Sequence, residues 1–305
     1  MTRISDLALQ QALLSGFQRA SDAATTSQIQ LSTGKVSDRY SGIGAQTTQL
    51  LSAEGVQTRT AAYENAANIA LSRLQIQEGA VTSISDTIGD IRQLFVTTLA
   101  NGASELLLPE IETAAQRVLG ALNTQSGGVF VFGGTDGTQP PVNAQSLDDI
   151  GAAANTDDLF ADGERARLAV EAGTTIDGGP LASEFARRLI GEFGELANAP
   201  DTLGAFDGEL TAAQRDFLVE KVARFDQIAA ALNTELGLNG VAQQQASDAI
   251  TRGRQASDLA ELVAGEIEDA DLAEVVAKLN QDQLAIQAAA QALAQATQLS
   301  LLNFI

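Results

Sequence analysis

The sequence predicts a mainly α-helical protein: long helices from both chain ends form a discontinuous bundle, or coiled-coil rod, and a small β-rich insert interrupts them. Apolar residues recur at steps of three, four and seven over long stretches near both ends. Between these stretches lies a segment rich in glycine and acidic residues, where the helical period is lost. No fixed repeat of about 20 to 50 residues is present, which argues against a solenoid.

The C-terminal stretch from Gln283 to Ile305 contains no charged side chain. Apolar residues recur there and just before it at seven-residue spacing, as in a helix seam: Leu272, Leu279, Ile286 and Leu293. Glutamines recur at four-residue spacing on another face: Gln283, Gln287, Gln291 and Gln295. A free-standing helix usually carries Glu and Lys on its outer face, so this helix is predicted to be covered by neighbours.

The N-terminal stretch, residues 1–38, predicts a second long helix of similar chemistry. Its apolar residues are spaced for one helical face: Leu9, Leu13, Phe17, Ala20, Ala24 and Leu31. Few residues are placed to form ion pairs along the helix, and Ser, Thr and Gln are frequent. We therefore expect the two chain ends to pack together.

The segment between them predicts further helices on each side of the insert. A loop over residues 34–44 precedes a long helix ending at Asn101-Gly102, where glycine suits a left-handed cap. The remaining predicted elements are a helix over 109–123, a strand or hairpin over 127–134, a strand over 167–171, a helix over 185–196, a helix turning at Leu238-Asn239-Gly240, a helix over 241–263, and a final helix that begins in the acidic cluster at 266–274.

This order of elements predicts three regions. They are a terminal helical assembly domain (1–40 with 266–305), a helical core (41–126 with 185–265) and an acidic β-rich insert (127–184).

Composition excludes several classes of function. The chain has 18 Lys and Arg against 39 Asp and Glu, so nucleic acid and anionic membranes are unfavourable partners. It has no Cys, His or Trp, which removes thiol chemistry, imidazole bases and the commonest zinc ligands. The N-terminus lacks the unbroken apolar core of a signal peptide, and the Gln-rich C-terminal stretch is a poor membrane span. We expect neither a cofactor nor membrane insertion.

Three local patterns have chemical interpretations, each weaker than a structural one. Ser32 and Lys35 match S-x-x-K, but the companion motifs of the penicillin-recognising enzymes are absent. The carboxylate pairs Asp148-Asp149 and Asp157-Asp158 lack the ligand spacing of a calcium loop. Residues 133–137 lack phosphate-loop spacing and predict a tight turn. No catalytic, cofactor-binding or metal site is predicted.

Four stretches carry a family resemblance: MTRIS at the N-terminus, LSTGKVSD at 31–38, GGVFVFGGTDG at 127–137, and IEDADLAEVVAKL followed by LSLLNFI at the C-terminus. Together they resemble the flagellin superfamily and, within it, the hook-filament junction proteins (the hook-associated protein 3 family). After LSTGK the family usually shows an acidic pair, whereas this chain has Asp38-Arg39.

The resemblance implies a subunit exported through the flagellar type III channel without a cleaved signal, whose terminal helices become ordered against neighbouring subunits. It implies as partners copies of the chain in a ring or helical layer, another hook-associated protein or flagellin, and an export chaperone. Burying Gln and Ser between subunits costs far less than burying unpaired charge. The expected interface residues are Leu7, Leu14, Phe17, Ile286, Leu293, Leu301, Leu302 and Phe304.

Three alternatives remain open from the sequence. A flagellin would use the same terminal helices but polymerise by itself into a filament. A secreted enzyme or peptidoglycan-binding protein would depend on Ser32 and Lys35. A coiled-coil secretion effector would have stable terminal helices as an isolated monomer.

Overall fold

The protein forms two compact units in a computed structural model. The structure describes the main chain of residues 2–302 and the side chains of residue 8 and residues 11–295. One unit, the terminal unit, combines residues 1–59 with 256–305, and the other, the central unit, comprises residues 60–255. The three-part division expected from the sequence stays a prediction.

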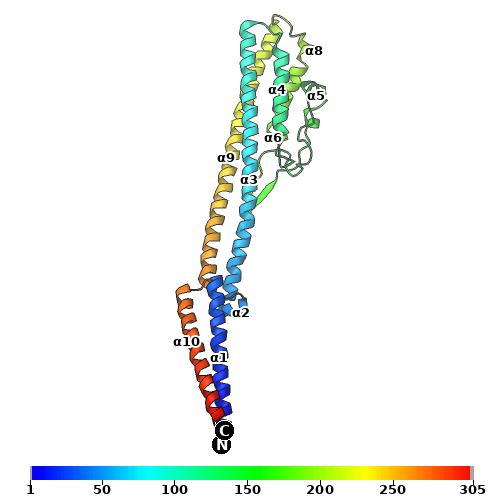
Figure 1. Cartoon of the computed structure of the whole chain (residues 1–305). Coiled ribbons are helices and arrows are strands. Elements are labelled where there is room, and N and C mark those ends of the chain that lie inside the picture. Colours follow the sequence, from blue (N-terminus) through cyan, green and yellow to red (C-terminus); the bar gives the residue numbers. More distant parts are fainter. Residues whose placement is uncertain (1, 303–305) are drawn as a thin grey trace. The chain divides into compact units, whose positions relative to one another are not determined.

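The terminal unit is built on two helices that run antiparallel along each other, α1 (Thr2–Thr33) and α10 (Leu272–Leu302) (Figure 1). This confirms the prediction that long helices from both chain ends pack together. The unit also contains α2 (Tyr40–Ile43), a 3-10 helix (Gly44–Gln46), the beginning of α3 (Thr47–Asn101) and the end of α9 (Ala212–Glu268).

The first helix is shorter than predicted, because it ends at Thr33 and not near residue 38. Gly34 has a φ of 72°, in the left-handed region that glycine adopts without a steric penalty. Its amide still donates to the carbonyl of Gln30 at 2.8 Å, so this residue closes the last helical turn. The predicted loop therefore begins at its first glycine.

The central unit combines most of α3 and α9 with shorter elements that cover part of their length. They are α4 (Leu107–Leu122), β1 (Gln125–Ser126), β2 (Val129–Phe130), α5 (Leu147–Ala152), the 3-10 helix η2 (Thr156–Leu159), β3 (Arg167–Glu171), β4 (Thr174–Asp177), α6 (Ala182–Phe185), α7 (Arg187–Ala197) and α8 (Ala199–Leu203). Pro200 stands in the first turn of α8, where its missing amide costs no helical hydrogen bond.

The strands form two separate antiparallel hairpins, as expected of a small β-rich insert. In the first hairpin Gln125 lies opposite Phe130, and in the second Leu168 lies opposite Ile176. The strand predicted over Arg167–Glu171 is confirmed with the same bounds. The short helix α5 was missed, although Ser146 and Asp149 form a capping box at its start.

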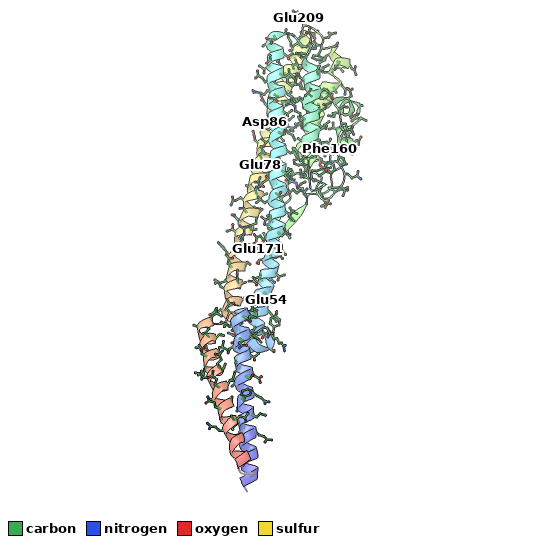
Figure 2. All side chains as sticks on the ribbon, in the orientation of Figure 1. Glu54, Glu78, Asp86, Phe160, Glu171 and Glu209 are labelled. Atoms are coloured by element: carbon green, nitrogen blue, oxygen red, sulfur yellow. The ribbon has the colours of Figure 1, made fainter. Side chains whose placement is uncertain are left out.

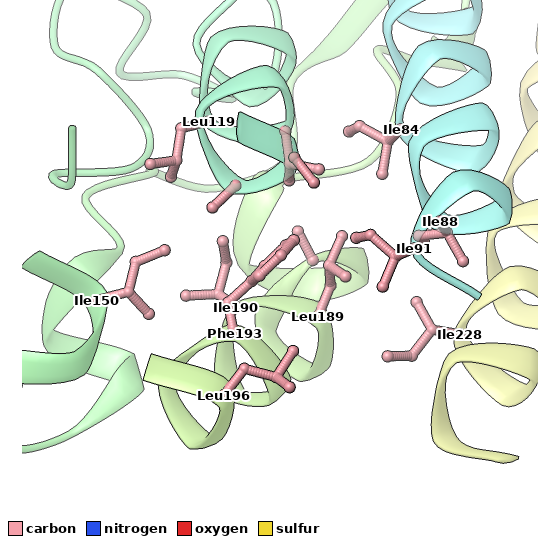
Figure 3. Packing of buried hydrophobic residues seen from close by; sticks show 14 of the residues in the cluster. Ile84, Ile88, Ile91, Leu119, Ile150, Leu189, Ile190, Phe193, Leu196 and Ile228 are labelled. Carbon is pink, nitrogen blue, oxygen red and sulfur yellow. The ribbon is translucent and has the colours of Figure 1, made fainter. Parts of the chain in front are cut away.

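A continuous apolar core holds the central unit together (Figure 3). α3 contributes Ile84, Ile88 and Ile91 at three- and four-residue steps, and α7 contributes Leu189, Ile190, Phe193 and Leu196. Leu119 of α4, Ile150 of α5 and Ile228 of α9 are the other residues labelled in Figure 3. Burying aliphatic and aromatic side chains of this size contributes about 1.5 to 3 kcal/mol each.

The predicted turn at Leu238-Asn239-Gly240 is wrong, because α9 continues unbroken from Ala212 to Glu268. Gly240 does not adopt a positive φ, and glycine inside a helix costs only about 1 kcal/mol relative to alanine. Buried side chains stand on both sides of this position, among them Leu232 before it and Ala242 and Ala246 after it. Their burial outweighs the local helix preference.

Charged groups are also buried in the central unit. Lys221 of α9 is 1% exposed, and its ammonium binds Glu192 and Glu195 of α7. Glu192, 4% exposed, also accepts from Arg224 at 3.0 Å. Glu192 is therefore the shared acceptor of two cations from α9.

Replacing this shared acceptor, Glu192→Ala, is expected to lower the free energy of unfolding by about 3 kcal/mol, because breaking a buried ion pair leaves charge without its counter-charge. The loss falls at the lower end of the usual range, since Glu195 still binds Lys221. Urea unfolding monitored by circular dichroism measures the change. The matched control is Glu220→Ala, which removes an exposed partner of Arg224 and should leave the midpoint almost unchanged. Equal effects of the two variants would contradict this account.

Candidate assembly surface

A short main-chain contact, here called the clip (residues 34–36 with 268–270), joins the chain just after α1 to the chain just before α10. The amide of Val36 donates to the carbonyl of Glu268 at 2.7 Å, and the amide of Ala270 donates to the carbonyl of Gly34 at 2.8 Å. Lys35 and Asp269 are the opposed residues of this antiparallel bridge. The clip thus places the end of α1 beside the start of α10.

Side chains reinforce the clip and fasten the segment that follows it to α3. The Lys35 ammonium lies 2.9 Å from a carboxylate oxygen of Glu268, and this hydrogen bond raises the pKa of Lys35 above its ordinary value. The Tyr40 hydroxyl donates to Glu54 of α3, labelled in Figure 2, at 3.2 Å, which raises the pKa of that tyrosine. Each of these bonds favours the protonated form of its donor.

The facing sides of α1 and α10 form a seam with the predicted spacing. Its residues are buried or half-buried: Leu13, Phe17, Ala20, Ala24 and Ser27 on α1, and Val275, Leu279, Asp282, Ile286, Ala289 and Leu293 on α10. Alternating steps of three and four keep both rows on one helix face. Leu272, expected to begin this row, is instead 49% exposed at the first residue of α10.

The seam contains one polar pair between the two helices. The Ser27 hydroxyl, on a residue that is 5% exposed, donates to a carboxylate oxygen of Asp282 at 3.3 Å. Asp282 is the one charged residue in the rows named above.

The outer surface of α10 carries the predicted row of amides. Gln283, Gln287, Gln291 and Gln295 are all exposed. Large apolar residues are also exposed on the two helices: Leu14 (48%), Ile29 (45%) and Leu31 (41%) on α1, and Leu284 (67%) on α10. The terminal unit therefore presents an uncharged amide row together with apolar side chains outside its own seam.

The residues expected at an assembly interface fall into three groups. Phe17, Ile286 and Leu293 lie half-buried in the seam within one chain, whereas Leu14 is exposed. Leu7, Leu301 and Leu302 belong to α1 and α10, but their side chains lie outside the described residues, as does the whole of Phe304. Their role in assembly stays a prediction. Sequence reasoning missed Ile29 and Leu284 as exposed apolar residues.

The S-x-x-K residues are engaged elsewhere. The Ser32 hydroxyl donates to the main-chain carbonyl of Ile29 at 2.9 Å, and Lys35 binds Glu268 in the clip. An activated serine needs a base that accepts its proton. Here Ser32 makes a hydrogen bond at the end of α1, and Lys35 makes a salt bridge.

The acidic pairs and the glycine pattern likewise have structural partners. Asp149 accepts from the amides of Gln145 and Ser146 before α5, which lowers its pKa, and Asp157 binds Arg187 at 3.1 Å. Gly134 has a φ of 64°, and a Cβ there would lie 2.2 Å from the Glu164 carbonyl oxygen. The described part of the chain contains no group of three or more Asp, Glu, His or Cys residues arranged to hold a metal ion. Among its helices, none combines the length and hydropathy needed to cross a membrane.

Comparison with known proteins gives consistent matches at both ends of the chain. Residues 4–136 match the model of the bacterial flagellin N-terminal helical region, and residues 222–305 match that of the bacterial flagellin C-terminal helical region. No curated protein matches the sequence.

Solved structures show the same fold at low sequence identity. A structure described as a putative flagellar hook-associated protein from Vibrio parahaemolyticus has a TM-score of 0.59 at 16% identity, covering 76% of this chain and 99% of that one. FlgL from Bacillus cereus has a TM-score of 0.54 at 12% identity, covering 71% of this chain and 98% of that one.

The clip depends on the backbone conformation of Gly34, so Gly34→Ala should weaken the terminal unit. A non-glycine residue in the left-handed region costs about 1 kcal/mol or more. Hydrogen exchange at neutral pH measures the result, with faster exchange expected at the amides of Val36 and Ala270. The matched control is Gly16→Ala inside α1. A Cβ there meets no atom within 4 Å, and alanine favours the helix more than glycine does, so amide exchange should slow. Unchanged exchange in the Gly34 variant would show that the clip does not need this conformation.

The salt bridge of the clip can be tested through the titration of its lysine. Glu268 raises the pKa of Lys35, so their salt bridge stabilises the folded chain. This stabilisation is complete below the ordinary lysine pKa of 10.5 and is lost as pH rises through the higher pKa of Lys35 in the folded state. Glu268→Gln should therefore lower the pKa of Lys35, measured by NMR of the lysine side chains. Lys278, which binds Glu274 at 2.8 Å, is the internal control and should keep its pKa. A Lys35 pKa equal in both proteins would exclude the salt bridge.

Proposed function

The chain belongs to the flagellin family, and we propose that within the bacterial flagellum it is the structural subunit that joins the hook to the filament, assembling through α1 and α10. It acts as an extracellular adaptor and catalyses no reaction. Its proposed partners are copies of itself in a ring or helical layer, another hook-associated protein or flagellin, and an export chaperone that binds it before export without a cleaved signal.

The exposed, uncharged surface of α10 is the observation that carries this proposal. The chain has a formal net charge of −21, yet Gln283, Gln287, Gln291 and Gln295 form an outward row without charge. Identical subunits bear identical charges, so an acidic row on this helix would repel the same row on a neighbouring copy. Amides can exchange water for hydrogen bonds between subunits at much smaller cost than carboxylates.

The exposed apolar residues support the same surface. Leu14, Ile29 and Leu31 occur on α1, and Leu284 is two-thirds exposed on α10. Apolar side chains beside uncharged amides suit an interface that is largely dehydrated on assembly. Nucleic acid does not fit a surface of this charge, and no membrane insertion is proposed.

The junction role is favoured over a filament role because the fold also occurs in a protein described as a putative hook-associated protein. Flagellin remains the alternative, since it would use the same terminal helices. Purified chain in assembly buffer distinguishes the two. A junction subunit should form no long filaments visible by electron microscopy. Long filaments formed by the chain alone would assign it to flagellin.

Removing Leu299–Ile305 should leave export intact and abolish attachment of the filament to the hook, because the last turn of α10 and the residues after it are lost. Motility and the amount of filament shed into the medium measure the loss. Retention of normal motility would overturn the role of the C-terminal end.

A finer form of the same test adds charge to the amide row through the double change Gln287→Glu and Gln291→Glu. The seam faces the other way, so the chain should still fold, while attachment should fall by an order of magnitude or more because carboxylates would be buried unpaired. Gln227→Glu, at an exposed position of α9, is the control and should attach normally. Normal attachment of the double variant would place the interface elsewhere.

A further inference from the structure

The central unit contains a hollow that the proposed joining of hook to filament does not use. The hollow measures about 530 Å³, within the usual size range of small-molecule sites. Its walls come from α5 and the loop after it, η2, α7, α8 and, on α9, Phe217. Most of the described residues that line it are glycine, alanine, asparagine or threonine, and Glu195 is the one with a charge.

Two glycines of α7 line the hollow although packing does not require them. Gly191 and Gly194 lie on the side of α7 opposite the row that this helix buries in the core (Figure 3). A Cβ at Gly191 would come no closer than 3.8 Å to the Thr156 hydroxyl, and one at Gly194 no closer than 3.6 Å to Ile150. Alanine therefore fits at both positions and would strengthen the helix. What the two glycines provide is open space in the hollow.

Two asparagines at the edge of the hollow are each fixed at one end of their amide. The Asn155 side-chain oxygen accepts from the amide of Asp157 at 3.2 Å, so its NH₂ group is left as a donor. The Asn198 NH₂ group donates to the carbonyl of Gly151 at 3.1 Å, so its oxygen is left as an acceptor. The hollow thus has a hydrogen-bond donor and an acceptor, each held in place by the fold.

The remaining polar and aromatic groups suit an uncharged ligand. The Thr156 hydroxyl makes no hydrogen bond to any residue that the structure describes, so it can both donate and accept. Glu195 is 54% exposed and binds the Lys221 ammonium, which balances its charge. Phe217 adds an aromatic ring, beneath which no free cation is needed, because the Lys221 ammonium already lies 5.0 Å from the ring centroid.

We infer that this hollow binds a neutral sugar, as a free saccharide or as a unit of a glycan. A sugar ring has a face of C–H groups, which packs on an aromatic ring such as Phe217, and hydroxyls that both donate and accept. Asn155, Asn198 and Thr156 offer the matching groups. The carboxylate of Glu195 opposes a sulfated or sialylated ligand, on a chain whose net charge is already −21.

A peptide segment fits the hollow less well than a sugar does. An extended peptide binds by adding a strand to a sheet edge, and none of the described residues that line the hollow belongs to a strand. A bound helix needs a row of apolar contacts, whereas Ile150 and Phe217 are the only large apolar side chains among the described lining residues.

The first experiment applies the full chain, fluorescently labelled, to an array of neutral, sulfated and sialylated glycans. Binding is expected to neutral glycans only. The free saccharide with the strongest signal is then titrated into the chain labelled with ¹⁵N at glycine. The amide signals of Gly191 and Gly194 should shift, and that of Gly120, which lies on α4 away from the hollow, should not.

The second experiment fills the hollow through the double change Gly191→Ala and Gly194→Ala. The melting temperature should rise by about 2 to 4 °C for each change, because alanine favours a helix more than glycine does. Affinity for the same saccharide, measured by calorimetry, should fall at least tenfold. The matched control is Gly120→Ala, where a Cβ meets no atom within 4 Å, and it should raise the melting temperature while leaving the affinity unchanged.

Absence of binding to every neutral glycan would overturn the inference, as would stronger binding to the sulfated or sialylated ones. Full affinity of the double variant would place the sugar elsewhere on the chain. A lower melting temperature of the double variant would show that packing requires the glycines, which would also contradict this account. The inference does not depend on the junction role, because attachment of the filament in cells should be normal in the double variant.

Discussion

Two main-chain hydrogen bonds, from Val36 to Glu268 and from Ala270 to Gly34, set the arrangement of the terminal unit. They fix the end of α1 beside the start of α10, so the two helices have to run along each other in opposite directions. That constraint turns one row of each helix inward and leaves the amide row of α10 outward. The positive φ of Gly34 is what allows the chain to leave α1 in the required direction.

The two units use polar groups in opposite ways. The central unit buries Lys221 and Glu192 beside a large apolar core, where Phe225 packs edge-on against Phe95 with ring centroids 5.5 Å apart. The terminal unit has a narrow seam and exposes uncharged amides. A unit with its own broad core is complete as a single chain, whereas a narrow seam with apolar residues left outside suits completion by neighbours.

Much of the fold could be predicted because it depends on local spacing. The heptad rows identified α3 and α10, and Asn101-Gly102 identified the end of α3, where Gly102 has a φ of 73°. Gly240 misled because its cost of about 1 kcal/mol is small beside tertiary burial. The sequence contained no pattern that predicts the clip, because main-chain hydrogen bonds do not depend on side-chain type. The Ser27 to Asp282 pair joins residues 255 positions apart, which a single sequence does not relate.

The separation of the clip's two sides also sets an order of events. Lys35 and Glu268 are 233 positions apart, and all residues of the central unit lie between them. During synthesis from the N-terminus, the central unit has every residue it needs before α10 exists. Closing the clip is entropically cheaper once that long loop has already become compact. The first helix to be synthesised, α1, is thus the last to be packed. Until α10 packs against it, a protein that binds amphipathic segments can contact its apolar face.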